Sequence, residues 1–245
     1  MKYFFTDHSI MPKKEKIRSM FDSIAPDYDK LNHILSLDID KGWRKKAVRE
    51  IADTAHPLQV LDVACGTGDF AIAVAKAAAP GSHVTGIDLS EGMMSVGRRK
   101  VASEGLEGTI HMEQGDCERM DFADGAFDRV SVAFGVRNFE HREKGLSEML
   151  RVLRPGGKAV ILELSVPSNP VFRAMYKVYF LHVLPAIGGM VSGDRGAYTY
   201  LPSSVLRFPE PEAFMKTMSS CGFQDVRTES FTCGICRMYT GRKAL

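Results

Sequence analysis

Three acidic residues in the first half of the chain each stand at or near the end of an apolar segment. Asp62 lies in "VLDVACGTGDFA", Asp88 ends "HVTGID", and Asp116 follows "IHMEQG". If these segments are parallel strands, their carboxyl ends meet at one edge of a sheet, where open α/β folds bind ligands. Three carboxylates there can accept hydrogen bonds from an ammonium group, from ribose hydroxyls and from an adenine amino group. The spacing predicts a nucleotide-like ligand that carries positive charge.

Two glycines, Gly66 and Gly68, mark the turn between the first of these segments and the helix predicted after it. Glycines permit close approach of a ligand, and a helix start offers free N–H groups. The run from Gly66 to Ala71 also satisfies the dinucleotide pattern G-x-G-x-x-G/A, which keeps an NAD-dependent oxidoreductase as an alternative. Because Asp62 would be unfavourable beside a pyrophosphate, the acidic pattern favours S-adenosylmethionine as the ligand. No metal is predicted.

A guanidinium and an amide close the apolar segment "VSVAFGVRNFEH". Arg137 and Asn138 follow a run typical of a buried strand, so they are predicted to lie beside the ligand. Arginine stays protonated and stabilises negative charge that develops on oxygen. The alternative is that Arg137 pairs with a nearby carboxylate such as Glu140 and only starts a helix.

A second polar and aromatic cluster occurs late in the chain, in the predicted loop "GAYTYLPSSVLRFPEP". It contains Tyr198, Tyr200 and Ser203. Tyrosines can stack on an acceptor ring or form hydrogen bonds to its oxygens. We assign Tyr200 to catalysis together with Arg137 and Asn138; the alternative is that the tyrosines only cover the fold.

Apolar runs and helical periodicities alternate along most of the chain, which predicts an α/β fold with a doubly wound, mainly parallel, seven-stranded sheet. A helical cap over residues 1–55 precedes the ligand-binding domain over residues 56–245, and a lid is inserted at about 168–210. Strands are predicted at 59–64, 83–88, 109–114, 127–134, 158–164, 223–231 and 235–241, and helices at 41–54, 70–79, 91–103, 142–153 and 211–221.

Composition is that of an ordinary globular protein, with 245 residues and a formal net charge of +2. Mixed charge without a basic stripe gives no support for a nucleic-acid partner. Five scattered cysteines indicate reduced thiols, and the start of the chain has neither signal-peptide nor transit-peptide character. These observations predict a cytoplasmic protein. The pair Cys233 and Cys236 is interpreted as structural because no second pair accompanies it.

Residues 168–192 form a strongly apolar segment that Arg173, Lys177, His182 and Pro185 interrupt. A spanning helix needs about 20 predominantly apolar residues, so this segment is not predicted to cross a membrane. Charges spaced by four residues and aromatic residues around them are typical of a helix that lies in a membrane surface. The alternatives are a helix that covers the sheet or that forms a homodimer.

Four separated stretches carry a resemblance to the ubiquinone/menaquinone biosynthesis C-methyltransferases, a family of class I S-adenosylmethionine-dependent methyltransferases. They are "YDKLNHILSLDIDKGW", "AFGVRN", "RVLRPGGKAVILELS" and "YTYLPSSVLRFP". The chain departs from that family at Leu31, where Met is usual, at Asp40, where His is usual, and at Arg154, where Lys is usual. We interpret Asp40 as a helix-capping or surface residue.

The resemblance implies methyl transfer to a ring carbon of a polyprenylated quinol, with demethylmenaquinol giving menaquinol or, as the alternative, the corresponding ubiquinol step. It implies cofactor contacts from Thr67, Asp88, Asp116, Cys117 and the backbone of the glycine turn, with Tyr28 packed over the cofactor.

For the acceptor side, we expect Arg137, with a water molecule, to help remove the quinol proton, and Asn138 to fix the ring. His33 and Asp69 are interpreted as structural. A non-catalytic lipid-binding protein remains a third class of function.

Overall fold

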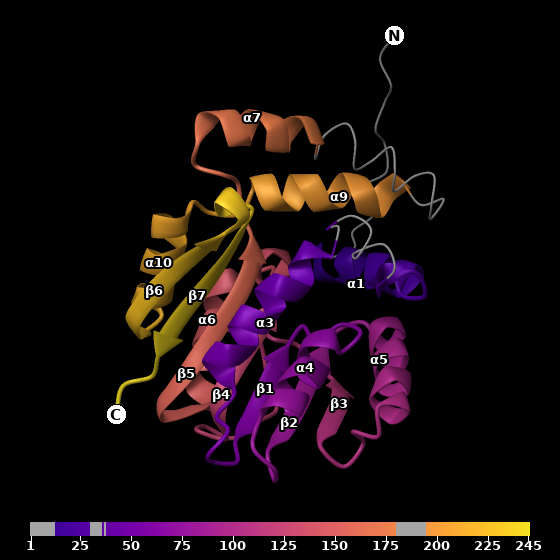
Figure 1. Ribbon diagram of the computed structural model, residues 1–245, viewed down its shortest axis with the longest axis vertical. Coiled ribbons are helices and arrows are strands. Elements are labelled where there is room, and N and C mark those ends of the chain that lie inside the picture. The colour runs from indigo at the N-terminus through magenta and orange to yellow at the C-terminus, as the bar shows by residue number, and fades with distance from the viewer. Residues whose placement is uncertain (1–12, 30–35, 37, 180–194) are drawn as a thin grey trace.

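One seven-stranded sheet organises the computed structural model, which describes residues 13–29, 36, 38–179 and 195–245 (Figure 1). The strands follow the order β3-β2-β1-β4-β5-β7-β6. All neighbouring pairs are parallel except those that β7 makes with β5 and β6. Their bounds are β1 Gln59–Val63, β2 His83–Asp88, β3 Ile110–Gln114, β4 Phe127–Ala133, β5 Leu153–Leu164, β6 Gln224–Phe231 and β7 Cys236–Arg242.

From β1 the chain adds β2 and β3 on one side of the sheet, and it then returns to add β4 and the later strands on the other side. The strand order therefore changes direction between β1 and β4. At such a switch point the loops after neighbouring strands diverge and leave a crevice at their carboxyl ends. The predicted doubly wound, mainly parallel sheet of seven strands is therefore confirmed, and its crevice lies where the acidic residues and Arg137 were expected.

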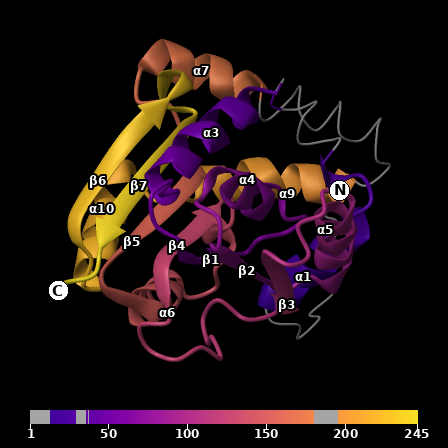
Figure 2. The ribbon, with the colours of Figure 1, turned by 60° about the horizontal axis from the view of Figure 1, so that its bottom comes forward.

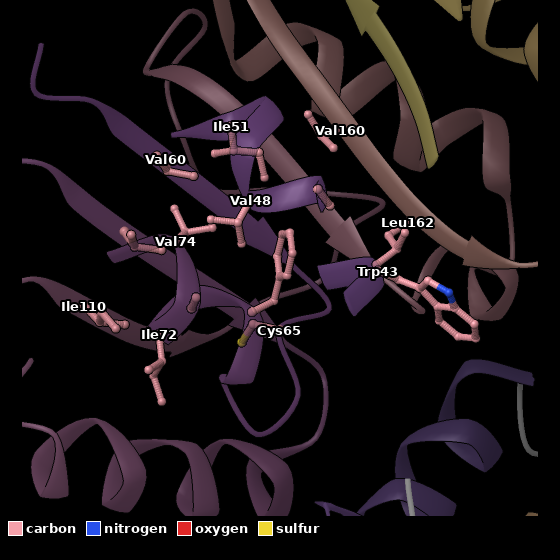
Figure 3. Close-up of a cluster of buried hydrophobic side chains, with 14 of the residues drawn as sticks. Trp43, Val48, Ile51, Val60, Cys65, Ile72, Val74, Ile110, Val160 and Leu162 are labelled. Carbon is pink, nitrogen blue, oxygen red and sulfur yellow. The ribbon is translucent and has the colours of Figure 1, made fainter. Parts of the chain in front are cut away.

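Helices cover both faces of the sheet. On one face lie α3 (Ile39–Ile51), α4 (Asp69–Ala77) and α5 (Glu91–Ser103), and on the other lie α6 (Arg142–Val152) and α10 (Pro211–Ser220). The helix predicted at 41–54 corresponds to α3, and its apolar side chains face the sheet. Trp43, Val48 and Ile51 are buried with Val160 and Leu162 of β5 in one cluster (Figure 3). Side chains buried to this degree each contribute about 1.5–3 kcal/mol to stability.

Three further helices lie beyond the carboxyl ends of the parallel strands: α1 (Lys13–Ile24), α7 (Pro170–Val178) and α9 (Arg195–Leu206) (Figures 1 and 2). Tyr176 and Val205 are buried together, with Met20, Ile24 and Leu201 packed against them. This small core joins the three helices above the crevice.

Two local predictions need correction. The predicted loop "GAYTYLPSSVLRFPEP" is largely helical, because α9 continues through Pro202 and packs Leu201 and Val205 into the small core. The fifth strand begins at Leu153 rather than at residue 158. Leu153 pairs with Phe127 before a register shift, so the Pro-Gly-Gly run is an irregularity inside the strand rather than a turn before it.

Candidate active site

A pocket of about 760 Å³, open mouth included, lies between α1 and the carboxyl ends of β1, β2 and β4. Five of the predicted cofactor residues and one predicted catalytic residue line it: Tyr28, Gly66, Asp88, Asp116, Cys117 and Asn138. The strand ends thus bring together residues that are far apart in the sequence.

Asp88 connects the end of β2 to the glycine turn. Its Oδ2 atom accepts a hydrogen bond from the Gly66 amide at 2.9 Å, and Oδ1 accepts one from the Ser90 amide at 2.9 Å. Burial raises the pKa of Asp88, and these N–H groups oppose the shift. Each carboxylate oxygen can accept a second hydrogen bond, so Asp88 retains acceptor capacity toward the pocket. Gly66 has a φ of +55°, a left-handed conformation that favours glycine.

Asp62 lies within β1 behind the pocket and does not line it. The side chain is buried, and Ser131 donates a hydrogen bond to Oδ1 at 2.7 Å. Its Oδ2 atom has no hydrogen-bond partner among the described residues. Burial raises the pKa of Asp62 to about 7. A buried carboxylate with spare acceptor capacity can organise the loop that follows β1.

Asp116 and Cys117 form the wall after β3. Lys14 of α1 forms an ion pair with Oδ2 of Asp116, and the Glu118 amide donates to Oδ1 at 3.0 Å. Burial, reinforced by the neighbouring charge of Asp116, raises the pKa of Cys117 well above its ordinary value. The Cys117 thiol therefore offers a neutral surface to the pocket.

Thr67 and Gly68 do not line the pocket, although the sequence grouped them with the cofactor residues. Thr67 is buried, and its hydroxyl donates to Asp29 at 2.6 Å. Gly68, with a φ of +77°, is the residue from which α4 starts. Asp69 forms an ion pair with Lys100, in keeping with the structural role expected for it.

Arg137 lies in a short 3₁₀ turn after β4, and its partner is not Glu140. The Nη1 atom of Arg137 lies 2.7 Å from Oε1 of Glu163, a fully buried residue near the end of β5. Oε2 of Glu163 accepts from the Arg137 amide at 3.0 Å, and Oε1 also accepts from the Leu164 amide at 2.8 Å. Arg137 Nη1 donates a second bond to the Phe134 carbonyl.

Burial opposes the charge of Arg137, but Glu163, together with Tyr28 and Tyr200, raises the pKa of Arg137 above its ordinary value. The Nε atom of Arg137 is buried without a hydrogen-bond partner in the described part of the chain. A buried ion pair of this kind needs several hydrogen bonds to offset the cost of desolvation. Glu163 supplies them, and the guanidinium keeps a fixed positive charge. The sequence signal for Glu163 was a lone acidic residue in the apolar run "AVILEL".

Asn138 lines the pocket, whereas the other two predicted catalytic residues, Arg137 and Tyr200, do not. The Tyr200 hydroxyl donates to Oδ1 of Asn138 at 2.9 Å. Burial raises the pKa of Tyr200, and the charge of Arg137 opposes that shift. The Ser203 hydroxyl donates to the Tyr200 carbonyl within α9. The structure therefore places Arg137, Asn138 and Tyr200 in one neighbourhood. The Tyr198 side chain and His33 lie outside the described residues.

A model of the ubiE/COQ5 methyltransferase family matches residues 10–243 of the chain. The chain belongs to the ubiE/COQ5 methyltransferase family. Membership confirms the predicted methyltransferase and its methyl donor, S-adenosylmethionine, and decides against the NAD-dependent oxidoreductase.

Relatives in the ubiE/COQ5 family cover nearly the whole chain. A protein of Geobacter sulfurreducens named ubiquinone/menaquinone biosynthesis C-methyltransferase UbiE is 50% identical over 98% of this chain and 93% of its own length. A demethylmenaquinone methyltransferase of Bacteroides fragilis is 47% identical over 94% of both chains. The match runs through the cap, the sheet and α9 alike.

Solved structures of low identity support the fold alone. The [4+2]-cyclase SpnF superposes with a TM-score of 0.71 at 17% identity, covering 96% of this chain and 98% of that one. A phosphoethanolamine N-methyltransferase of Haemonchus contortus gives a TM-score of 0.63 at 15% identity over 83% of this chain and 53% of that one.

Asp40, which we expected to cap a helix or to lie at the surface, does neither. The residue is only 4% exposed and lies in the first turn of α3, after Asp38. Its Oδ2 atom lies 3.3 Å from Nε of Arg44, and Ser36 donates to Oδ1 at 2.6 Å. The interpretation failed because Asp40 lies on the buried side of α3, as Trp43 does, whereas its neighbours Ile39 and Lys41 are exposed. Arg44 compensates the buried charge.

Proposed function

We propose that this enzyme transfers the methyl group of S-adenosylmethionine to a ring carbon of a polyprenylated demethylmenaquinol, which gives menaquinol. The observation that carries the proposal is the fixed charge of the buried Arg137 directly next to Asn138, a pocket-lining residue that is bonded to Tyr200. The names of the relatives from Geobacter sulfurreducens and Bacteroides fragilis support the quinone as acceptor and the menaquinone branch. The first of these names keeps the benzoquinol acceptor as the alternative.

The pocket residues fit the methyl donor by their chemistry. Asp88 and Asp116 offer carboxylate oxygens for ribose hydroxyls and for an adenine amino group. Gly66 exposes backbone at the close turn, and Tyr28 and Cys117 supply uncharged surface. When bound, the donor supplies an electrophilic methyl group on a sulfonium cation.

On the acceptor side, a ring carbon attacks the methyl group well only when the ring is electron-rich, as in the phenolate form of the quinol. We assign to Arg137 the stabilisation of that phenolate, because its charge is permanent next to Glu163. For the same reason Arg137 does not itself take a proton, and the phenol proton passes to water. As the new C–C bond forms, the bond from sulfur to the methyl group breaks, and the hydrogen on the methylated ring carbon then leaves as a proton to restore the aromatic ring. Asn138, held by Tyr200, fixes the ring oxygen in place.

Replacement of Arg137 tests this assignment. Lysine keeps the positive charge but lacks the planar guanidinium with its several N–H donors. Arg137→Lys should therefore lower kcat by about 10²–10³-fold, with unchanged affinity for S-adenosylhomocysteine. The matched control is Arg99→Lys, since Arg99 is exposed on α5. Full turnover by Arg137→Lys would refute the role, and an equal loss in Arg99→Lys would point to a general effect.

The face of α7 is the proposed contact with the membrane that holds the substrate. Val171, Met175 and Val178 are 67%, 63% and 58% exposed, and Phe172 is 44% exposed. Arg173 donates to the Pro167 carbonyl at 3.0 Å and so ties the helix to the fold. No helix among the described residues is long and apolar enough to span a bilayer. An apolar face on a short helix favours peripheral contact by a cytoplasmic enzyme; a second copy of the chain is the alternative occupant.

A further inference from the structure

The segment from Asp22 to Asp29 connects the end of α1 to the pocket. Tyr28 lines the pocket, and its ring packs edge-on against Phe21 with centroids 6.0 Å apart. Ala25, between them, is only 3% exposed. An aspartate lies at each end of this segment. Asp22 contacts the start of α5, and Asp29 contacts the glycine turn and Lys100 near the end of α5.

At the first end, Asp22 binds the start of α5. Its Oδ1 atom accepts hydrogen bonds from the Ser90 hydroxyl at 2.6 Å and from the Gly92 amide at 2.9 Å. Ser90 in turn accepts from the Met93 amide and caps the same helix. A carboxylate is stabilised at a helix N-terminus, where unpaired N–H groups and the helix dipole converge. A Cβ on Gly92 would lie 3.2 Å from the Asp22 Cα, so glycine permits this close approach.

At the second end, Asp29 binds the back of the glycine turn. Oδ1 accepts from the buried Thr67 hydroxyl at 2.6 Å, and Oδ2 lies 2.6 Å from Nζ of Lys100. Thr67 directly follows Gly66, whose amide is bonded to Asp88 in the pocket. Asp29 therefore joins the cap segment to the loop that forms the pocket floor, and it explains why Thr67 faces away from the pocket.

We infer that Asp22 and Asp29 are positioning residues: together they clamp residues 22–29 across the pocket and hold Tyr28 against the methyl donor. The inference rests on the proposed function in one respect, which is that this pocket binds the methyl donor. Asp27 provides an internal comparison, because it lies in the same segment but is exposed, and its side chain accepts no hydrogen bond from a described residue.

The test compares Asp22→Ala, Asp29→Ala and the control Asp27→Ala. We expect each clamp variant to bind S-adenosylhomocysteine about 10-fold more weakly by calorimetry, and Asp27→Ala to bind like the wild type. In the free protein, backbone amides of residues 22–29 should exchange with deuterium faster in both clamp variants, while the amides of β1 and β4 keep their protection. Unchanged affinity together with unchanged exchange at 22–29 would overturn the inference.

The double variant Asp29→Ala with Thr67→Val distinguishes two roles for Thr67. In one, Thr67 only holds Asp29, and in the other it binds the ligand directly. If Thr67 acts through Asp29, then Asp29→Ala combined with Thr67→Val should bind no more weakly than Asp29→Ala alone. Additive losses would show that Thr67 contacts the ligand itself and would overturn the Asp29 part of the inference. Wild-type protein that fails to bind S-adenosylhomocysteine would instead refute the proposed function, and deuterium exchange in the free protein would still decide the clamp.

Discussion

The Arg137–Glu163 pair gives the sharpest consequence for stability and catalysis together. Glu163 accepts three hydrogen bonds, from the guanidinium and the amide of Arg137 and from the amide of Leu164. Glu163→Gln conserves the volume of the side chain. The new NH₂ group, however, replaces an oxygen that accepts from an N–H group, so two donors face each other, and the guanidinium of Arg137 loses its counter-charge. Removing one partner of a buried ion pair costs about 3–5 kcal/mol. For a chain of this size, Tm should fall by roughly 6–20 °C.

The same substitution should lower kcat, because a displaced guanidinium no longer meets the phenolate, and a shift of about 1 Å can cost about 10²-fold. Denaturant unfolding measures the first effect, and turnover with methyl-labelled donor well below the new Tm measures the second. Glu107→Gln is the control, since Glu107 is exposed, and it should change stability by less than about 0.5 kcal/mol. A loss below about 1 kcal/mol in Glu163→Gln, with wild-type kcat, would refute the role of the pair.

Three further predictions concern the buried carboxylate, the helix packing and α7. Because Asp62 has a pKa of about 7 when folded and about 4 when unfolded, its ionisation destabilises the fold as pH rises between these values. Asp62→Asn should therefore gain stability relative to the wild type from pH 4 to pH 8, by up to about 4 kcal/mol in urea unfolding; a pH-independent difference would contradict this. Gly97→Ala places a Cβ 2.6 Å from the nearest side-chain atom and should cost about 1–3 kcal/mol, whereas Gly42→Ala meets nothing within 4 Å and should stabilise by about 0.5–1 kcal/mol. Equal changes in the free energy of unfolding of Gly97→Ala and Gly42→Ala would show that the close contact at Gly97 does not affect stability. Serine at both Val171 and Met175 should weaken sedimentation with anionic phosphatidylglycerol vesicles at low salt several-fold, and undiminished binding would exclude α7 as the contact.

The sheet was predictable because each buried parallel strand is a short apolar run bounded by a turn. β2 and its helix α5 have the predicted bounds, and β1, β3 and β4 differ by one residue at an end. Such runs bury both faces of a strand, so local sequence and tertiary structure agree.

The helix α9 was not predictable from local sequence, because Pro202 lies inside it, with two tyrosines before the proline and two serines after it. Proline removes a helical hydrogen bond and usually ends the pattern. Packing of Leu201 and Val205 against Tyr176, which lies on another helix, compensates for this loss. That contact joins segments about 30 residues apart, and no local rule supplies it.

The acidic strand ends located the pocket, but they did not reveal the polar partners of its residues. The carboxylate nearest to Arg137 in the sequence is that of Glu140. Arg137 nevertheless pairs with Glu163, because β5 lies beside β4 in the sheet. Thr67 is paired with Asp29, 38 residues away. The strand order fixes such pairs, so a carboxylate in an apolar strand indicates that a partner exists without showing which one.

The most direct test of the central claim offers purified enzyme and methyl-labelled S-adenosylmethionine to two acceptors in parallel. One is a reduced demethylmenaquinone, and the other is a reduced demethylated benzoquinone precursor. We predict label in the ring of the naphthoquinol, whereas label in both acceptors would extend the enzyme to the ubiquinone step. Binding of S-adenosylhomocysteine without label in either quinol would contradict the assignment.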